Sequence, residues 1–109
     1  MAYDEFLANR VRSQLEFYQE NFEEKRMFGG ITFLFGGKMT VGIVKNKLAV
    51  RVIAEKMDEE LAKEHTSPMD FTKTPLKEFI YVNPEGVKTE TELLYYIELG
   101  LEHAKRKLK

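Results

Sequence analysis

The chain has 109 residues, of which 43% are hydrophobic and 32% are charged. This length suits one hydrophobic core and excludes two independent ones, so we expect a single domain over residues 1–109. The formal net charge of -1 excludes a global attraction to nucleic acid or acidic membranes, and the lack of cysteine excludes disulfides and thiolate metal sites.

The amino-terminal segment from Met1 to Arg12 is interrupted by charged residues, where a signal peptide needs an unbroken apolar stretch. No apolar run reaches the roughly 18 residues of a membrane span. We therefore expect a cytoplasmic protein with no membrane partner.

A helix is predicted at the start of the chain. From Tyr3 to Phe22, apolar residues recur at steps of three and four, which places them on one stripe of an amphipathic helix. The charged run Glu23 to Arg26 then ends the pattern.

Three short strands are predicted next. Pairs of glycines and a Lys-Asn-Lys turn separate runs rich in β-branched and aromatic residues, at Ile31 to Phe35, Met39 to Val44 and Leu48 to Ile53. In the third run Arg51 falls on the face opposite Leu48, so we expect it on a wetter face or in an ion pair.

The second half of the chain continues with a short surface helix over Glu55 to Lys63 and a strand over Phe79 to Val82, with Met69 to Phe71 as a further candidate strand. Thr89 and Glu92 form a capping box that starts an amphipathic terminal helix. The pattern predicts an α+β domain in which helices cover one face of an antiparallel sheet.

Several short motifs follow one another along the chain: Met27-Phe28-Gly29-Gly30, Phe33, Gly37-Lys38-Met39, Leu48, Val50-Arg51, Pro68-Met69-Asp70-Phe71, Tyr81-Val82 and Pro84-Glu85. Their order and spacing resemble the amino-terminal domain of the TfoX/Sxy family, from about Tyr3 to Leu108. The resemblance implies the order α-β-β-β-α-β-β-α, an architecture similar to secretion chaperones, and frequent dimerisation. Larger relatives regulate natural competence in bacteria and carry a second domain, so a chain ending at Lys109 is expected to be the stand-alone amino-terminal domain.

The segment Met27, Phe28, Gly29 and Gly30 is a candidate partner-binding site. A structural explanation of the glycine pair is favoured over this one, because a turn, a bulge or a close backbone approach also requires glycine. Replacement of Gly29 or Gly30 by valine is expected to cost about 1–3 kcal/mol if either has a positive φ or a tight contact.

Aromatic residues are too numerous for one helical stripe, and Phe17 and Tyr95 fall outside the main apolar faces. Exposed aromatic side chains commonly mark a protein interface. We therefore expect a homodimer and an unknown regulatory protein partner, with Phe17 and Tyr95 as contact residues.

Three weaker alternatives remain. The cations Lys105, Arg106, Lys107 and Lys109 favour a solvated helix end that suits the helix dipole, and alternatively a weak nucleic-acid contact. No histidine has a metal-ligand neighbour at suitable spacing, and His103 is expected to act as a cation near the helix end. A small enzyme or ligand binder would use the loop with His65, Ser67, Asp70 and Thr72, but turn chemistry explains these residues equally well.

The sequence thus favours a non-enzymatic regulatory or interaction module without a cofactor, resembling competence and transcription regulators. A nucleic-acid-binding accessory protein is the second hypothesis, and a small ligand-binding protein or enzyme is the third.

Overall fold

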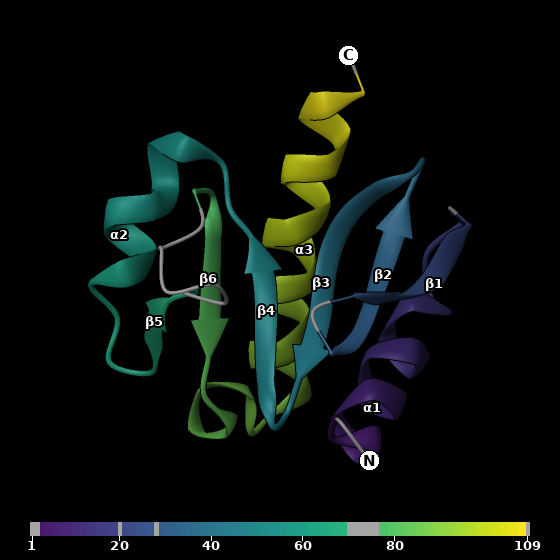
Figure 1. The fold of residues 1–109 in the computed structure, drawn as a ribbon, viewed down its shortest axis with the longest axis horizontal. Helices are drawn as coiled ribbons and strands as arrows, with labels where there is room; N and C mark the ends of the chain where they lie inside the picture. The colour runs from purple at the N-terminus through teal and green to yellow at the C-terminus, as the bar shows by residue number, and fades with distance from the viewer. Residues whose placement is uncertain (1–2, 20, 28, 70–76, 109) are drawn as a thin grey trace.

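The computed structural model describes residues 3–19, 21–27, 29–69 and 77–108. Its strands form a six-stranded sheet in the order β1-β2-β3-β4-β6-β5, and every neighbouring pair is antiparallel (Figure 1). The strands are β1 (Phe22–Met27), β2 (Gly30–Phe35), β3 (Lys38–Val44), β4 (Lys47–Arg51), β5 (Thr66–Pro68) and β6 (Phe79–Val82).

The helices are α1 (Glu5–Leu15), α2 (Met57–Leu61) and α3 (Glu90–Lys107), with short 3₁₀ segments η1 (Ala54–Lys56) and η2 (Pro84–Val87). Asp4 caps α1 by accepting the backbone N–H bonds of Phe6 and Leu7. Thr89 and Glu92 form the predicted capping box of α3. None of the helices in the described ranges is long and apolar enough to cross a membrane.

The main core lies between the sheet and the two longer helices. Leu7 and Val11 of α1 and Ile97 of α3 pack against one face of the sheet, to which Phe33 and Val50 belong. Figure 1 shows α3 running behind β3 and β4, with α1 beside it. A smaller cluster on the opposite face contains Val44, Ala49, Met69, Phe79 and Tyr81. The predicted α+β class, with helices covering one face of an antiparallel sheet, is confirmed.

Glycines are required at the β2–β3 turn and at the crossing of α3 over the sheet. Gly36 and Gly37, with φ of 58° and 82°, form the tight turn between β2 and β3. At Gly100, a Cβ atom would lie 2.3 Å from the carbonyl oxygen of Thr40, so α3 passes directly against the backbone of β3. The terminal helix can sit this close to the sheet only with glycine at the crossing.

The first helix is shorter than its apolar spacing predicts. It ends at Leu15, and Phe22 is the first residue of β1, a strand that the sequence did not predict. The spacing of Tyr18 and Phe22 has another cause, because the two rings pack edge to face with centroids 5.9 Å apart. The charged residues after Phe22 form an edge strand because pairing with β2 outweighs their weak β-propensity.

Other elements also begin or end at residues that differ from the predicted ones. The short helix predicted over Glu55 to Lys63 is divided into η1 and α2. The short strand before β6 is Thr66–Pro68, and Met69 lies just outside it. Asp70 and Phe71, the rest of the predicted strand, lie outside the described residues. Arg51 forms the expected ion pair, with Glu78 at 3.8 Å.

Candidate interaction surface

Met27 and Gly30 are the last pair of the antiparallel β1–β2 ladder. Gly29 has a φ of 74°, which favours glycine. A Cβ atom on Gly30 would lie 1.9 Å from the carbonyl oxygen of Ile43. The backbone therefore explains both glycines, and Phe28 lies outside the described residues.

Large apolar side chains are exposed at both ends of α1. Phe17 is 84% exposed just after the helix, as its position off the apolar stripe indicated, and Phe6 is 74% exposed in the first turn. Phe6 was not among the predicted contact residues. Its exposure could have been predicted, because Phe6 falls outside the apolar stripe that runs through Leu7, Val11 and Leu15.

Tyr95 is exposed to 44% but is not a free aromatic side chain. Its hydroxyl donates a short hydrogen bond to the Glu60 carboxylate and accepts one of 2.8 Å from Lys63 Nζ. Its ring also packs edge to face on Tyr96, with centroids 5.0 Å apart. Tyr95 thus faces α2, whereas Phe17 lies at the end of α1 and Met27 at the β1–β2 turn. The structure does not bring these candidate residues into one patch.

The Glu60 carboxylate is the main charged group that sequence reasoning missed, because it is fully buried on a helix predicted to lie on the surface. Its Oε1 lies 3.1 Å from Lys63 Nζ, although outside hydrogen-bond geometry. Burial opposes the charge on Lys63, but hydrogen bonds to Tyr95 and Glu60 outweigh it and raise the Lys63 pKa. Burial and the bond to Glu60 raise the pKa of Tyr95. The cluster therefore holds α2 against α3 with Lys63 charged and the Tyr95 phenol neutral.

A pocket of about 340 Å³ lies beside this cluster, between the end of α2 and the start of α3. His65 lines it together with Lys63, Glu92 and Tyr96. Of the other loop residues considered for chemistry, Ser67 lies in β5 opposite Tyr81, and Asp70 and Thr72 lie outside the described residues. Within the described ranges, no three His, Cys, Asp or Glu residues are grouped so that they could hold a metal ion.

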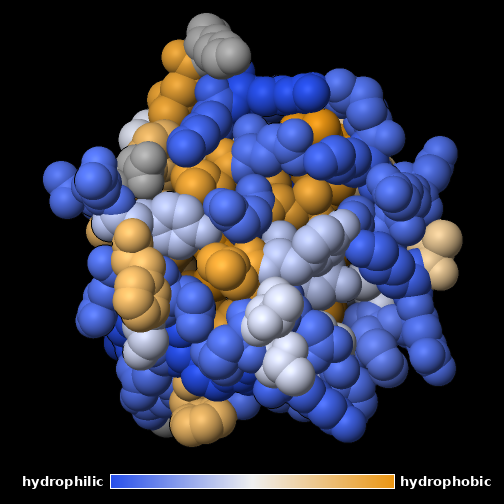
Figure 2. Space-filling view, turned by 180° about the vertical axis from the view of Figure 1, so that it is seen from behind, coloured by the Kyte–Doolittle hydropathy of each residue, from blue (hydrophilic) through white to orange (hydrophobic). Residues whose placement is uncertain are grey.

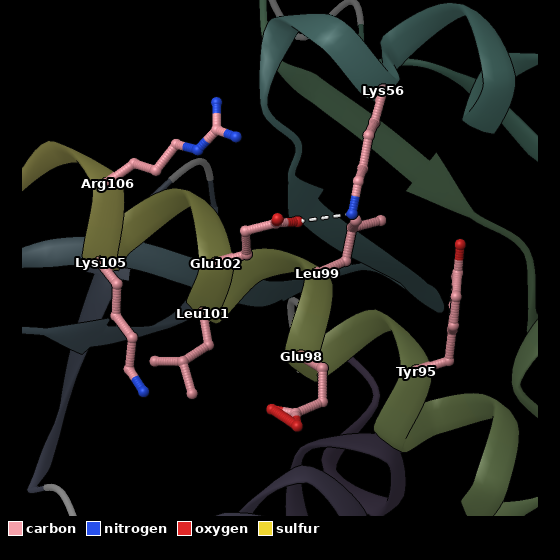
Figure 3. A pocket seen from close by; sticks show the side chains of 8 residues that line it. All are labelled: Lys56, Tyr95, Glu98, Leu99, Leu101, Glu102, Lys105 and Arg106. Atoms are coloured by element: carbon pink, nitrogen blue, oxygen red, sulfur yellow. Dashed lines mark hydrogen bonds and ion pairs between the residues drawn. The ribbon is translucent and has the colours of Figure 1, made fainter.

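A shallow groove of about 510 Å³ runs along the outer side of α3. Figure 3 shows Leu99 and Leu101 on the helix, with the ion pair of Lys56 and Glu102 bridging to η1 at 2.9 Å. Figure 2, which views the molecule from this side, shows apolar surface at the centre of the face and polar side chains around it. Charges of both signs therefore surround a small apolar floor.

The basic end of α3 is exposed but partly neutralised. Arg106 Nη1 lies 2.5 Å from the Glu55 carboxylate, and Lys105 Nζ lies 5.9 Å from the centre of the Phe35 ring. Arg10 pairs with Glu90 at the opposite end of α3, so the cations of α1 do not extend this patch. Lys107 is exposed, and Lys109 lies outside the described residues.

His103 differs from the sequence-based expectation of a cation near the end of the helix. It is 3% exposed, and its Nε2 lies 2.9 Å from Arg51 Nη2 and 2.7 Å from Glu78 Oε1. Its Nδ1 is buried with no hydrogen-bond partner among the described residues. Burial lowers the pKa of His103, aided by Arg51 and Lys107 and opposed by Glu78. The imidazole is therefore a neutral buried group that joins α3 to the ends of β4 and β6.

This lowered pKa predicts a loss of stability in acid. Unfolding restores the ordinary His103 value of 6.5, so the unfolded state binds the proton more tightly and the free energy of unfolding falls as pH drops below that value. Arg51 stays charged, and the Glu78 pKa is lowered, mainly by its hydrogen bond to His103, so that group titrates at more acidic pH. We expect His103→Gln to lose less stability than the parent between about pH 7 and 5 in urea unfolding. Equal losses in both proteins would show that His103 is not a buried neutral group.

The fold and this surface define a small α+β domain whose exposed features are an aromatic helix end, an apolar groove and an open sheet edge. A family model described as the TfoX N-terminal domain matches residues 13–104. The chain therefore belongs to the TfoX N-terminal domain family, as the resemblance indicated. No curated protein and no solved structure was found to match the chain.

Proposed function

We propose that this chain is a non-enzymatic interaction module of the cytoplasm, a homodimer that binds another protein and acts in regulation, including the control of transcription or competence. The observation that carries the proposal is the exposure of Phe17 and Phe6, at 84% and 74%, at the two ends of α1. Burying such a side chain contributes about 1.5–3 kcal/mol, which a monomer leaves unused at both positions. Aromatic side chains are enriched in the buried centres of protein interfaces.

The charged clusters support a structural interpretation. Glu60, Lys63 and Tyr95 join α2 to α3, and His103 with Arg51 and Glu78 joins α3 to the sheet. In each cluster opposite charges meet, and each cluster spans separate elements. Paired groups of this kind hold elements together, and nothing in their geometry requires a substrate.

The groove on α3 adds area to the proposed binding face. Its floor contains Leu99 and Leu101, and its rim carries Lys56, Glu98 and Glu102. An apolar centre with a polar rim is typical of transient protein interfaces. A partner with exposed apolar side chains and charges of both signs suits this surface better than a polyanion does.

The proposal is tested by purifying the tagged chain from its native cells at physiological salt, with and without nuclease. We expect a protein partner that is recovered equally in both samples. In a matched variant, Lys105→Gln, Arg106→Gln and Lys107→Gln together should still recover the protein partner, although in a smaller amount, because Lys105 and Arg106 also line the groove. Recovery of nucleic acid alone, lost in the neutralised variant and at raised salt, would instead establish the nucleic-acid hypothesis.

A further inference from the structure

Strand β1 leaves one side of its backbone unpaired. It forms one end of the sheet at the right of Figure 1, and among the strands that the structure describes it pairs only with β2. Edge strands present free N–H and C=O groups on which another strand can form. The other edge strand, β5, is shorter and ends in Pro68, whereas β1 contains no proline. Of the two edges, β1 is therefore better suited to pairing with another chain.

The side chains of β1 carry an ordered charge pattern. Two acidic residues, Glu23 and Glu24, are followed by two basic ones, Lys25 and Arg26, and all four are exposed. Arg12 holds Glu24 through hydrogen bonds of 2.8 and 2.9 Å. Among the described residues, Glu23, Lys25 and Arg26 form no ion pair. Charges often protect an edge strand from pairing. In β1, however, the order of the charges lets acidic residues of one strand face basic residues of an identical strand that runs antiparallel to it.

From this pattern we propose that β1 pairs antiparallel with β1 of a second copy across a twofold axis at Glu24, which joins both sheets into one. The inference deepens the proposed homodimer and rests on it. In an antiparallel pair, two residues that face each other must both point their backbone N–H and C=O groups toward the partner strand, or both away from it. Because this orientation alternates along a strand, two identical strands related by a twofold axis must have one residue opposite its own copy. With Glu24 at the axis, Glu23 of each copy lies opposite Lys25 of the other.

The alternative axis at Lys25 fits less well. It would place two unpaired lysines opposite each other, which is unfavourable for directly facing side chains. With the axis at Glu24, each central carboxylate is already held by Arg12 of its own chain. That register also places Arg26 opposite the ring of Phe22 and diagonal to Glu24 of the second copy. Glu23, Lys25 and Arg26, which form no ion pair with the described part of their own chain, then each gain an oppositely charged or aromatic neighbour.

The test is a charge swap followed by sedimentation velocity. Glu23→Lys alone would oppose lysines across the axis, and Lys25→Glu alone would oppose glutamates, so each variant should dimerise at least about tenfold more weakly than the parent. Mixing the two variants should restore dimers, because every crossed pair is then attractive. The double variant Glu23→Lys/Lys25→Glu should dimerise by itself for the same reason. The matched control is Lys88→Glu, which makes the same change in charge as Lys25→Glu at an exposed residue outside β1. It should have no effect on dimerisation.

The outcomes separate this inference from the proposed function. Dimers that resist both single changes would overturn the β1 pairing and leave a homodimer formed by another surface. A parent chain that stays monomeric would overturn both the pairing and the homodimer, while partner binding through α1 is scored separately by recovery of a protein. If one single variant unfolds in circular dichroism, the other single variant and the double variant still decide, because a weakened dimer in the first and a restored dimer in the second together require contact between positions 23 and 25.

Discussion

Gly30→Ala should destabilise the domain by at least the upper end of the roughly 1–3 kcal/mol typical of overpacked sites. The added Cβ atom would lie 1.9 Å from the carbonyl oxygen of Ile43 and 3.0 Å from its carbonyl carbon. These are backbone atoms of β3, so they can move away only by disrupting the β2–β3 ladder, in which Ile31 pairs with Ile43. Urea unfolding of the parent and the variant measures the effect.

The neighbouring glycine provides the control. Gly29 has a φ of 74° with nothing within 4 Å of its added Cβ atom, and asparagine tolerates this left-handed conformation. Gly29→Asn should therefore cost much less than Gly30→Ala. Equal effects would mean that the close approach to Ile43 is not what requires glycine at position 30.

Lys63→Met is expected to cost about 3 kcal/mol, the lower end of the range for breaking a buried ion pair. The change leaves the fully buried Glu60 carboxylate with Tyr95 as its remaining partner. The Lys63 side chain is 40% exposed, so water partly replaces it and moderates the loss. Thermal or urea unfolding at neutral pH measures the difference.

Two further variants define the cause. Lys56→Met removes the exposed pair with Glu102 and should have a much smaller effect. Glu60→Met combined with Lys63→Met replaces both charges and should recover most of the lost stability, because no buried carboxylate remains. A double variant as unstable as Lys63→Met would show that the lost ion pair is not responsible.

Much of the fold could be predicted because local patterns agreed with tertiary packing. The capping box at Thr89, the glycine turn at Gly36 and the alternation around Val50 each indicated an element that is present. Strand β1 was missed because its side chains are exposed on both faces, which removes the alternation that identifies a strand. The spacing of Phe22 from Tyr18 matched a helix although their contact is between a turn and a strand.

The candidate surface was predicted in part. The exposure of Phe17 and Tyr95 could be predicted, since a residue off a helical stripe has no core to face. The burial of Glu60 and His103 could not, because both depend on partners distant in sequence, Tyr95 and Glu78. The open edge of β1 could not be recognised until the strand itself was known.

The most direct test of the interaction module compares the proteins recovered from nuclease-treated native extract by the tagged parent and by Phe6→Ser/Phe17→Ser. Both side chains are exposed, so the variant should fold normally and retain its melting temperature. The proposed function predicts a protein partner that the parent retains and the variant loses. A partner recovered equally by both would contradict the aromatic ends of α1 as its binding site, and the absence of any retained protein would contradict the interaction module itself.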